Sequence, residues 1–254
     1  MIAAAMTAGA LVGCGGGGDV PRERAGQDRA GSVVALRLVE APTPLFDVPN
    51  YATKGTFAQV GGADGLDRVN AALRRVVISD QAAYEQSARD AGNEAARNAG
   101  NELRGSYETS VDPGLVSASS TVVSVLMPSI HRFPGGNHGA VVVSGTVQVP
   151  SGRRVGLAEL FAEPVRALSV LEREFEESFR RQEPSRAVCL TGWPWLRPTA
   201  HNYRHFALLE AGMALGFSRG NCQWLIATIP YDRLRPYFSP LAEQLADGVR
   251  APAA

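Results

Sequence analysis

Apolar residues recur along this chain with two different periods, which predict helices in some segments and strands in others. Between residues 64 and 101, Leu66, Val69, Leu73 and Val76 follow one another at spacings of three or four, the period of one helix face. The remainder of that segment is rich in alanine and charged residues. We therefore expect one long helix whose second half is more exposed than its first.

Strand patterns lie on both sides of this helix. Runs of β-favouring residues are separated by proline and glycine turn signals, at 33–39, 56–60, 106–111, 115–119, 120–133 and 140–149. Three more runs follow near the C-terminus, at 206–210, 213–217 and 223–229. The runs between residues 102 and 149 predict an antiparallel meander.

Two further helices are predicted in the second half of the chain. The first begins at Pro164, and its apolar face is expected to hold Val165, Leu168, Leu171, Phe175 and Phe179. The second is a single final helix whose buried side is expected to hold Leu234, Phe238, Leu241 and Leu245. Together these patterns predict an α+β fold, an antiparallel sheet packed by a few helices.

The N-terminus has the pattern of a lipoprotein signal peptide. Residues 2–13 are apolar or small, a run too short to span a bilayer as a helix. The run ends in Leu11-Val12-Gly13-Cys14, the pattern that a lipoprotein signal peptidase reads. No basic residue precedes the run, which departs from the usual signal. The alternative is a short buried N-terminal helix.

The segment after this signal favours the signal over the buried helix. Residues 15–18 are all glycine, and a polar, arginine-rich stretch continues to residue 31, which leaves such a helix nothing to pack on. We expect residues 1–14 to be the signal peptide, Cys14 to be acylated and 15–31 to form a flexible tether. The protein is then held on the extracytoplasmic side of the cell membrane by a lipid anchor.

Composition limits the possible size and function of the chain after the tether. The chain is 45% hydrophobic, which is typical of a globular protein, and its 25 basic residues equal its 25 acidic ones. This balance gives no support for nucleic-acid binding. The roughly 220 residues after the tether suffice for one domain or two small ones. We divide them into an N-terminal subdomain at 32–118 and a C-terminal domain at 119–250.

The number of cysteines is consistent with an exported protein. With Cys14 set aside for the lipid, Cys189 and Cys222 form an even number in an oxidising compartment. We predict a disulfide between them, which requires their Cα atoms to lie roughly 4.4–6.8 Å apart. Two separate buried thiols are the alternative.

Catalytic patterns are incomplete in this sequence. A Gly-x-Ser-x-Gly elbow is absent. A glycosidase needs a carboxylate pair, and candidates for it include Glu159, Glu172, Glu174 and Glu176. The last three are expected on the solvated side of the predicted helix, where no such pair is needed to explain them.

A histidine pair is the other candidate for chemistry. His201 and His205 stand four residues apart, but no third ligand completes a metal site around them. We therefore expect no metal and no cofactor. The chain is expected to be non-catalytic, and an envelope hydrolase acting on peptidoglycan or polysaccharide is the alternative.

Two groups of residues are candidates for binding. Gly135, Gly136 and His138 belong to a glycine-rich loop that is either a ligand-binding nest or, as we favour, a tight hairpin turn. Aromatic residues around the predicted disulfide are either exposed anchors for a partner or part of the core: Trp193, Trp195, Tyr203 and Trp224. Both readings of the aromatic group stay open.

The order of motifs in the second half resembles the RsiV-like C-terminal domain family, a domain of unknown function. A strand is followed by Gly-Gly-Asn-His-Gly at 135–139, a returning strand and Gly-Leu-Ala-Glu-Leu-Phe at 156–161. Ala-Gly-Met-Ala-Leu-Gly-Phe at 211–217 and Ile-Pro-Tyr-Asp-Arg-Leu at 229–234 resemble later elements of the family. This resemblance covers about 120–245. A weaker one covers about 50–110, where Val69-Asn70 resembles the pair that opens a helix in the companion domain.

The resemblance implies an extracytoplasmic binding module. Its partner is an envelope protein or a glycan, and the RsiV branch of the family implies a lysozyme-like protein. A secreted mycobacterial antigen is similar across both parts. Because this sequence shows neither a transmembrane helix nor a cytoplasmic anti-sigma segment, signalling by that route is not expected.

Overall fold

The computed structural model describes residues 35–40, 51–62, 65–99, 105–109, 115–132, 138–191, 196–219 and 222–250. Within it, Gly31–Ala254 forms one compact unit. Several predictions fall outside the described residues, namely those on the lipobox with its tether and on Gly135, Gly136, Trp193 and Trp195. In the part of the chain that is described, no helix is both long and apolar enough to cross a bilayer.

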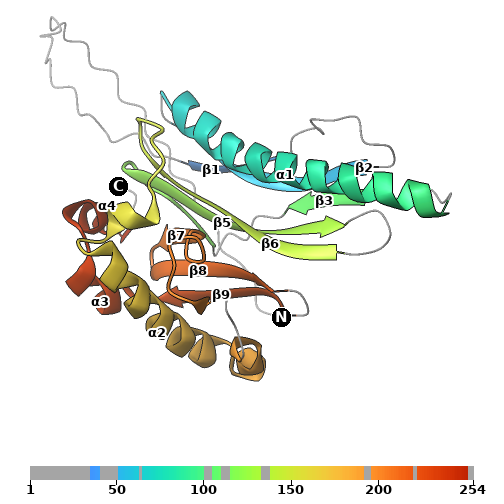
Figure 1. Cartoon of the computed structure of the whole chain (residues 1–254). Coiled ribbons are helices and arrows are strands. Elements are labelled where there is room, and N and C mark those ends of the chain that lie inside the picture. The colour runs from blue at the N-terminus through green and yellow to red at the C-terminus, as the bar shows by residue number, and fades with distance from the viewer. Residues whose placement is uncertain are drawn as a thin grey trace, which may run out of the picture. The chain divides into compact units, whose positions relative to one another are not determined.

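Six strands form the larger sheet (Figure 1). They are β1 (Ala35–Glu40), β2 (Tyr51–Gly61), β3 (Gly105–Thr109), β4 (Val116–Ala118), β5 (Val122–Arg132) and β6 (His138–Gln148). β2 and β3 are parallel and are connected through helix α1 (Asp67–Ala99), whereas the other pairs are antiparallel. The boundary predicted at residue 118 falls between two paired strands of this sheet, β4 and β5, so the sheet takes strands from both sides of it.

β5 and β6 pair along their full lengths, from Val122 opposite Gln148 to Arg132 opposite His138. Of the loop predicted at 135–139, residues 135–137 lie outside the described residues, and His138 and Gly139 belong to β6. β3 and β4 pair with opposite ends of β5.

Three antiparallel strands form the smaller sheet, β7 (Phe206–Leu209), β8 (Gly212–Arg219) and β9 (Gln223–Ile229). The elements stack in four layers (Figure 1). α1 covers one face of the larger sheet, the smaller sheet packs on the other face, and α2 (Pro164–Gln182) lies on the far side of the smaller sheet. The structure is an α+β fold, as the sequence predicts.

Alternation of side chains along β5 and β6 builds the central layers. Val123 and Val125 point toward α1, while Leu126, the residue after Val125, contacts the smaller sheet together with Val142. The two sheets approach closely at Gly216 of β8, where a Cβ atom would lie 2.7 Å from a methyl carbon of Val142. A larger residue at position 216 would push the sheets apart.

Side chains from neighbouring layers pair with the backbone at both edges of the smaller sheet. On β7, the hydroxyl oxygens of Ser124 and Ser144 accept the N–H groups of Leu208 and Phe206, at 2.7 and 3.2 Å, and the Ser117 hydroxyl donates to the carbonyl of Leu208. These serines lie on β4, β5 and β6, so the larger sheet holds the edge of the smaller one.

On β9, one side chain from α2 and one from the 3-10 helix after it also form hydrogen bonds with the backbone. The Gln182 amide donates to the carbonyl of Thr228 at 2.7 Å and accepts its N–H at 3.1 Å. The Arg186 guanidinium donates to the carbonyls of Cys222 and Trp224. Arg186 belongs to the 3-10 helix Pro184–Leu190 that follows α2.

The buried face of α2 holds Leu171, Phe175 and Phe179, as predicted, but the two predicted residues of its first turns lie outside it. Val165 is 85% exposed and Leu168 is only half-buried. Helical residues are rotated by about 100° each, which places Val165 about 120° away from Leu171. Glu174 lies within the buried sector and is 4% exposed, so its predicted solvated position is wrong.

The predicted final helix is interrupted. The structure has a short α3 (Tyr231–Leu234), a 3-10 turn (Arg235–Tyr237) and then α4 (Pro240–Arg250). Pro236 and Pro240 have no backbone N–H to donate within a helix, and Phe238 is extended, in an isolated bridge to Phe161. Leu234, Phe238 and Leu245 are nevertheless buried, as predicted.

The predicted disulfide is confirmed. Cys189 and Cys222 are bonded, with their Cα atoms 6.1 Å apart. The bond ties the 3-10 helix after α2 to the beginning of β9. It therefore fastens the outermost layer to the smaller sheet.

Candidate functional site

The segment at 196–205 has little regular structure, and Tyr203 anchors it. The Tyr203 side chain is fully buried, its hydroxyl donates to the carbonyl of Leu196 at 3.1 Å, and its ring meets the Phe217 ring edge-on at 5.0 Å. Burial raises the pKa of Tyr203 above its ordinary value, so the hydroxyl stays protonated. The N–H of Gly216 donates to the carbonyl of His205 and fixes the end of the segment.

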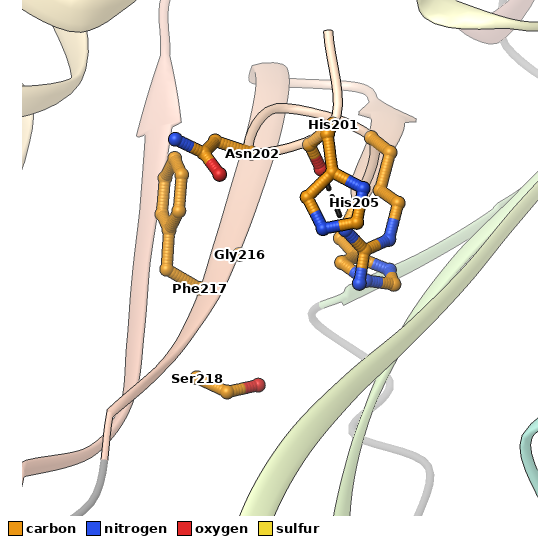
Figure 2. A pocket seen from close by; sticks show the side chains of 7 residues that line it. His201, Asn202, His205, Gly216, Phe217 and Ser218 are labelled. Atoms are coloured by element: carbon orange, nitrogen blue, oxygen red, sulfur yellow. Dashed lines mark hydrogen bonds between the residues drawn. The ribbon is translucent and has the colours of Figure 1, made fainter. Parts of the chain in front are cut away.

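This anchoring leaves the polar neighbours of Tyr203 at a surface hollow of about 200 Å³. In Figure 2, the imidazoles of His201 and His205 lie on one side of the hollow, and Asn202 and Phe217 on the other. Its lining residues are His201, Asn202, Arg204, His205, Gly216, Phe217 and Ser218.

Two further hollows adjoin the first. One, of about 330 Å³, lies between α1 and β6 and includes Ser79, Asp80, Ser144, Arg154, Arg204 and His205. The other, of about 470 Å³, includes Ser144, Arg154, Gly156, Ala158, Ala200, Arg204 and Phe206. Arg204 borders all three hollows, so they are neighbours around one side chain. We call them the Arg204 groove.

The groove carries two arginines without carboxylate partners. Among the described residues, neither Arg154 nor Arg204 forms an ion pair; Arg204 donates instead to the carbonyl of His201 at 2.7 Å. Asp80 supplies an acidic group at the α1 side, where its carboxylate lies 3.2 Å from Nε2 of His131. Positive charge is therefore concentrated away from α1.

His205 adds polarity to the groove without adding charge at neutral pH. Burial, followed by the nearby charge of Arg204, lowers the pKa of His205 to about 4. The carboxylate of Asp80 opposes this shift only in part. At pH 7 the imidazole is neutral and offers one hydrogen-bond donor and one acceptor.

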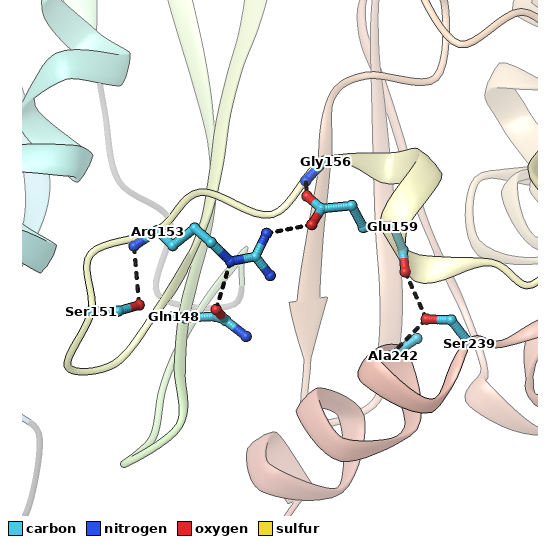
Figure 3. Close-up of polar contacts among 7 residues, drawn as sticks. All are labelled: Gln148, Ser151, Arg153, Gly156, Glu159, Ser239 and Ala242. Carbon is cyan, nitrogen blue, oxygen red and sulfur yellow. Dashed lines mark hydrogen bonds and ion pairs between the residues drawn. The ribbon is translucent and has the colours of Figure 1, made fainter.

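A polar network holds the turn that brings Arg154 into the groove (Figure 3). The Glu159 carboxylate accepts the N–H of Gly156 at 2.7 Å and pairs with the Arg153 guanidinium, which also donates to Gln148 at 2.9 Å. The Ser239 hydroxyl donates to the carbonyl of Glu159 at 2.6 Å. Arg153 is thus engaged in the scaffold, while the neighbouring Arg154 lines the groove.

The network also defines the part played by Glu159. Its hydrogen bond with Gly156, and then that with Arg153, hold the pKa of the carboxyl below its ordinary value. A general acid needs a raised pKa, so this environment suits a structural carboxylate. The other glutamates considered for a hydrolase, Glu172, Glu174 and Glu176, lie on α2, which contributes no residue to the groove.

The structure settles part of the aromatic group. Tyr203 belongs to the core and is not an exposed anchor. Trp224 is half-buried, and its indole N–H donates to the carbonyl of Val141 at 2.7 Å. The core alternative therefore holds for Tyr203, while Trp224 is partly buried and packs against the core.

Three histidines singled out in the sequence, and two arginines that were not, remain to be placed. His138 occupies the first position of β6, opposite Arg132. His201 and His205 both line the groove, but no group of three potential metal ligands occurs among the described residues. Sequence reasoning missed Arg154 and Arg204. The sequence could have drawn attention to Arg204, because it stands between Tyr203 and His205, which were both singled out.

Comparisons with known proteins give a structural likeness only. No protein-family model matches the chain, and no curated protein matches it. A DUF3298 family protein from Bacteroides fragilis NCTC 9343 is similar with a TM-score of 0.48 at 10% identity, over 85% of this chain and 98% of that one. A DUF3298 family protein from Pseudomonas aeruginosa PAO1 is similar with a TM-score of 0.49 at 15% identity, over 82% and 95%.

Proposed function

We propose that this protein is a non-catalytic binding protein of the cell envelope, anchored through Cys14, which takes a glycan or protein partner in the Arg204 groove. The observation that carries the proposal is the groove itself, where Arg154 and Arg204 lack carboxylate partners among the described residues. Charged groups left unpaired at a surface hollow are available to a ligand.

The scaffold around the groove supports a binding role. Tyr203 and the Glu159 network hold the two arginines on firmly packed or hydrogen-bonded segments, so little ordering is required when a ligand binds. The Cys189–Cys222 disulfide supports an oxidising, extracytoplasmic location.

A hydrolase receives less support from the described groove. Its acidic side chain, Asp80, is engaged with His131, and the nearby Glu159 carboxylate is held by Gly156 and Arg153. A pair of carboxylates facing each other across a bond to be cleaved is what glycosidase chemistry needs. The groove offers two guanidinium groups instead.

Anchoring and binding are tested separately. Cys14→Ala should release the full chain from the membrane fraction, whereas Gly15→Ala should leave it there, and fractionation with immunoblotting reads both. Membrane retention of the Cys14 variant would contradict the anchor.

For binding, immobilised wild-type protein and the Arg204→Gln variant are incubated with solubilised envelope and with purified lysozyme. Bound proteins and sugars are then identified by mass spectrometry and sugar analysis. Arg166→Gln, which changes an exposed arginine on α2, is the control. We expect one partner to be lost from the Arg204 variant and kept by the control. Equal capture by all three proteins would contradict a role for the groove.

A further inference from the structure

We infer that the Arg204 groove binds a glycan chain that carries carboxylate groups, such as a run of uronic acid units. This inference rests on the proposed binding function and names the chemical class of the ligand. Its starting point is the pair Arg154 and Arg204, which border the same two hollows and come from separate segments of the chain.

The charge of the ligand follows from the guanidinium groups. A planar guanidinium donates two parallel hydrogen bonds to a carboxylate, which makes arginine the usual partner for that group. The guanidinium groups of Arg154 and Arg204 stay charged at any physiological pH, so the groove keeps this positive charge. Asp80 repels a carboxylate at the α1 side, so acidic groups of the ligand are expected near Arg154 and Arg204.

The shape of the groove favours a chain over a single small anion. Three neighbouring hollows, which share Arg204, extend from Ser218 on β8 to Ala158 beyond β6. A closed pocket would surround one small molecule, whereas three hollows beside one arginine offer separate places for successive units. Several sugar units in sequence are needed to occupy them.

The remaining lining favours a sugar over a protein segment. Hydroxyl and imidazole groups line the first two hollows, from Ser79, His205 and Ser218, while the third is lined more by small and apolar residues. Protein interfaces usually centre on large apolar or aromatic anchors. The large aromatic side chain at the first hollow, Phe217, is 5% exposed and packed against Phe175 and Tyr203, so it is unavailable as such an anchor.

The test uses the full chain in detergent and isothermal titration with an oligogalacturonate of six units. The matched probe is the same chain with its carboxylates reduced to alcohols, and a hexaglutamate peptide carries similar charge on a different backbone. We expect binding of the uronate chain, at least tenfold weaker binding of the reduced chain, and weaker binding of the peptide.

Variants place the interaction in the groove. Arg154→Gln and Arg204→Gln should each weaken uronate binding about tenfold, the usual effect of losing a charge-assisted contact. Arg166→Gln should not. Both groove arginines are exposed, so the variants should keep the wild-type melting temperature, which circular dichroism checks.

Each other outcome overturns the inference. Equal binding of the reduced chain would remove the carboxylate requirement, and equal or tighter binding of hexaglutamate would identify an acidic protein segment as the ligand. Absence of uronate binding, or binding that survives both substitutions, would also refute it. If Arg204-dependent capture from envelope extract persisted in that case, the proposed function would stand and only the ligand class would fail.

Discussion

The two sides of the molecule use different chemistry to bury their cores. Between α1 and the larger sheet, the buried side chains are mainly small or aliphatic, with many valines, and Phe57 is the aromatic residue among them. On the α2 side, rings touch in two series, Phe179, Phe175, Phe217 and Tyr203 in one, and Phe161, Phe238 and Tyr231 in the other.

The difference follows from the shapes being packed. A regular helix on a regular sheet leaves evenly spaced gaps, which β-branched residues on a pleated surface fill well. The α2 side must also hold irregular segments, at 196–205 and 234–240. Large rings reach such segments and bury more surface per residue. The Arg204 groove lies where these regions meet, with Ser79 and Asp80 from α1 on one side and the Tyr203-anchored segment on the other.

The largest effect should come from removing a ring at the centre of the aromatic side. Phe175 is 0% exposed and contacts Phe179 and Phe217. Phe175→Ala should lower the free energy of unfolding by about 4 kcal/mol, through lost burial and the cavity that remains. Urea denaturation measures this loss.

Two further variants make that measurement a comparison. Leu73→Ala, in the aliphatic core of α1, should cost about 3 kcal/mol, while the exposed Val165→Ala should change stability by less than about 0.5 kcal/mol. A loss for Leu73→Ala greater than that for Phe175→Ala would reverse the comparison between the two sides.

The second effect concerns the disulfide, which belongs to the aromatic side alone. Cys189→Ser combined with Cys222→Ser should cost about 3 kcal/mol, because the unfolded chain regains the freedom that the closed loop removes. A reductant should destabilise the wild type by a similar amount. A further loss when reductant is added to the double variant would point to a different cause.

The smallest effect concerns pH and the groove between the two sides. The folded-state pKa of His205 is about 4, below the ordinary 6.5, so between these values the unfolded chain binds more protons than the folded one. The His205 contribution to stability is therefore complete above pH 6.5 and is lost as the pH falls toward 4. Arg204, Asp80, His201 and Arg154 are the charged or titratable groups that act on it.

His205→Asn removes this titration, so its urea midpoint should fall less than that of the wild type between pH 7 and pH 4.5. His201→Asn, at an exposed histidine of the same groove, serves as the matched variant. Identical pH profiles for the His205 variant and the wild type would show that His205 is not held neutral.

The regular elements were predictable because their signals are local. The stripe from Leu66 to Val76 and the β-favouring runs at 120–133 and 140–149 correspond to α1, β5 and β6. The disulfide followed from an even count of cysteines. An error arose at Val165, because two successive steps of three residues rotate this position about 120° away from Leu171 and out of the buried sector.

The site was less predictable, because it depends on contacts between distant segments. Nothing in the residues next to Arg154 shows that it will share a groove with Arg204; the meeting requires the turn held by Glu159 and the segment held by Tyr203. Sequence reasoning identified Tyr203 and the His201/His205 pair as noteworthy. Tyr203 proved to be the anchor that places the polar residues beside it.

The side chains that close the edges of the smaller sheet have a consequence for solubility. An open strand edge is a template on which a second chain can add, which is a route to aggregation. Here Ser124 and Ser144 occupy N–H groups along β7, and Gln182 and Arg186 occupy groups along β9. These two strands should therefore resist joining into intermolecular sheets even when the protein is concentrated.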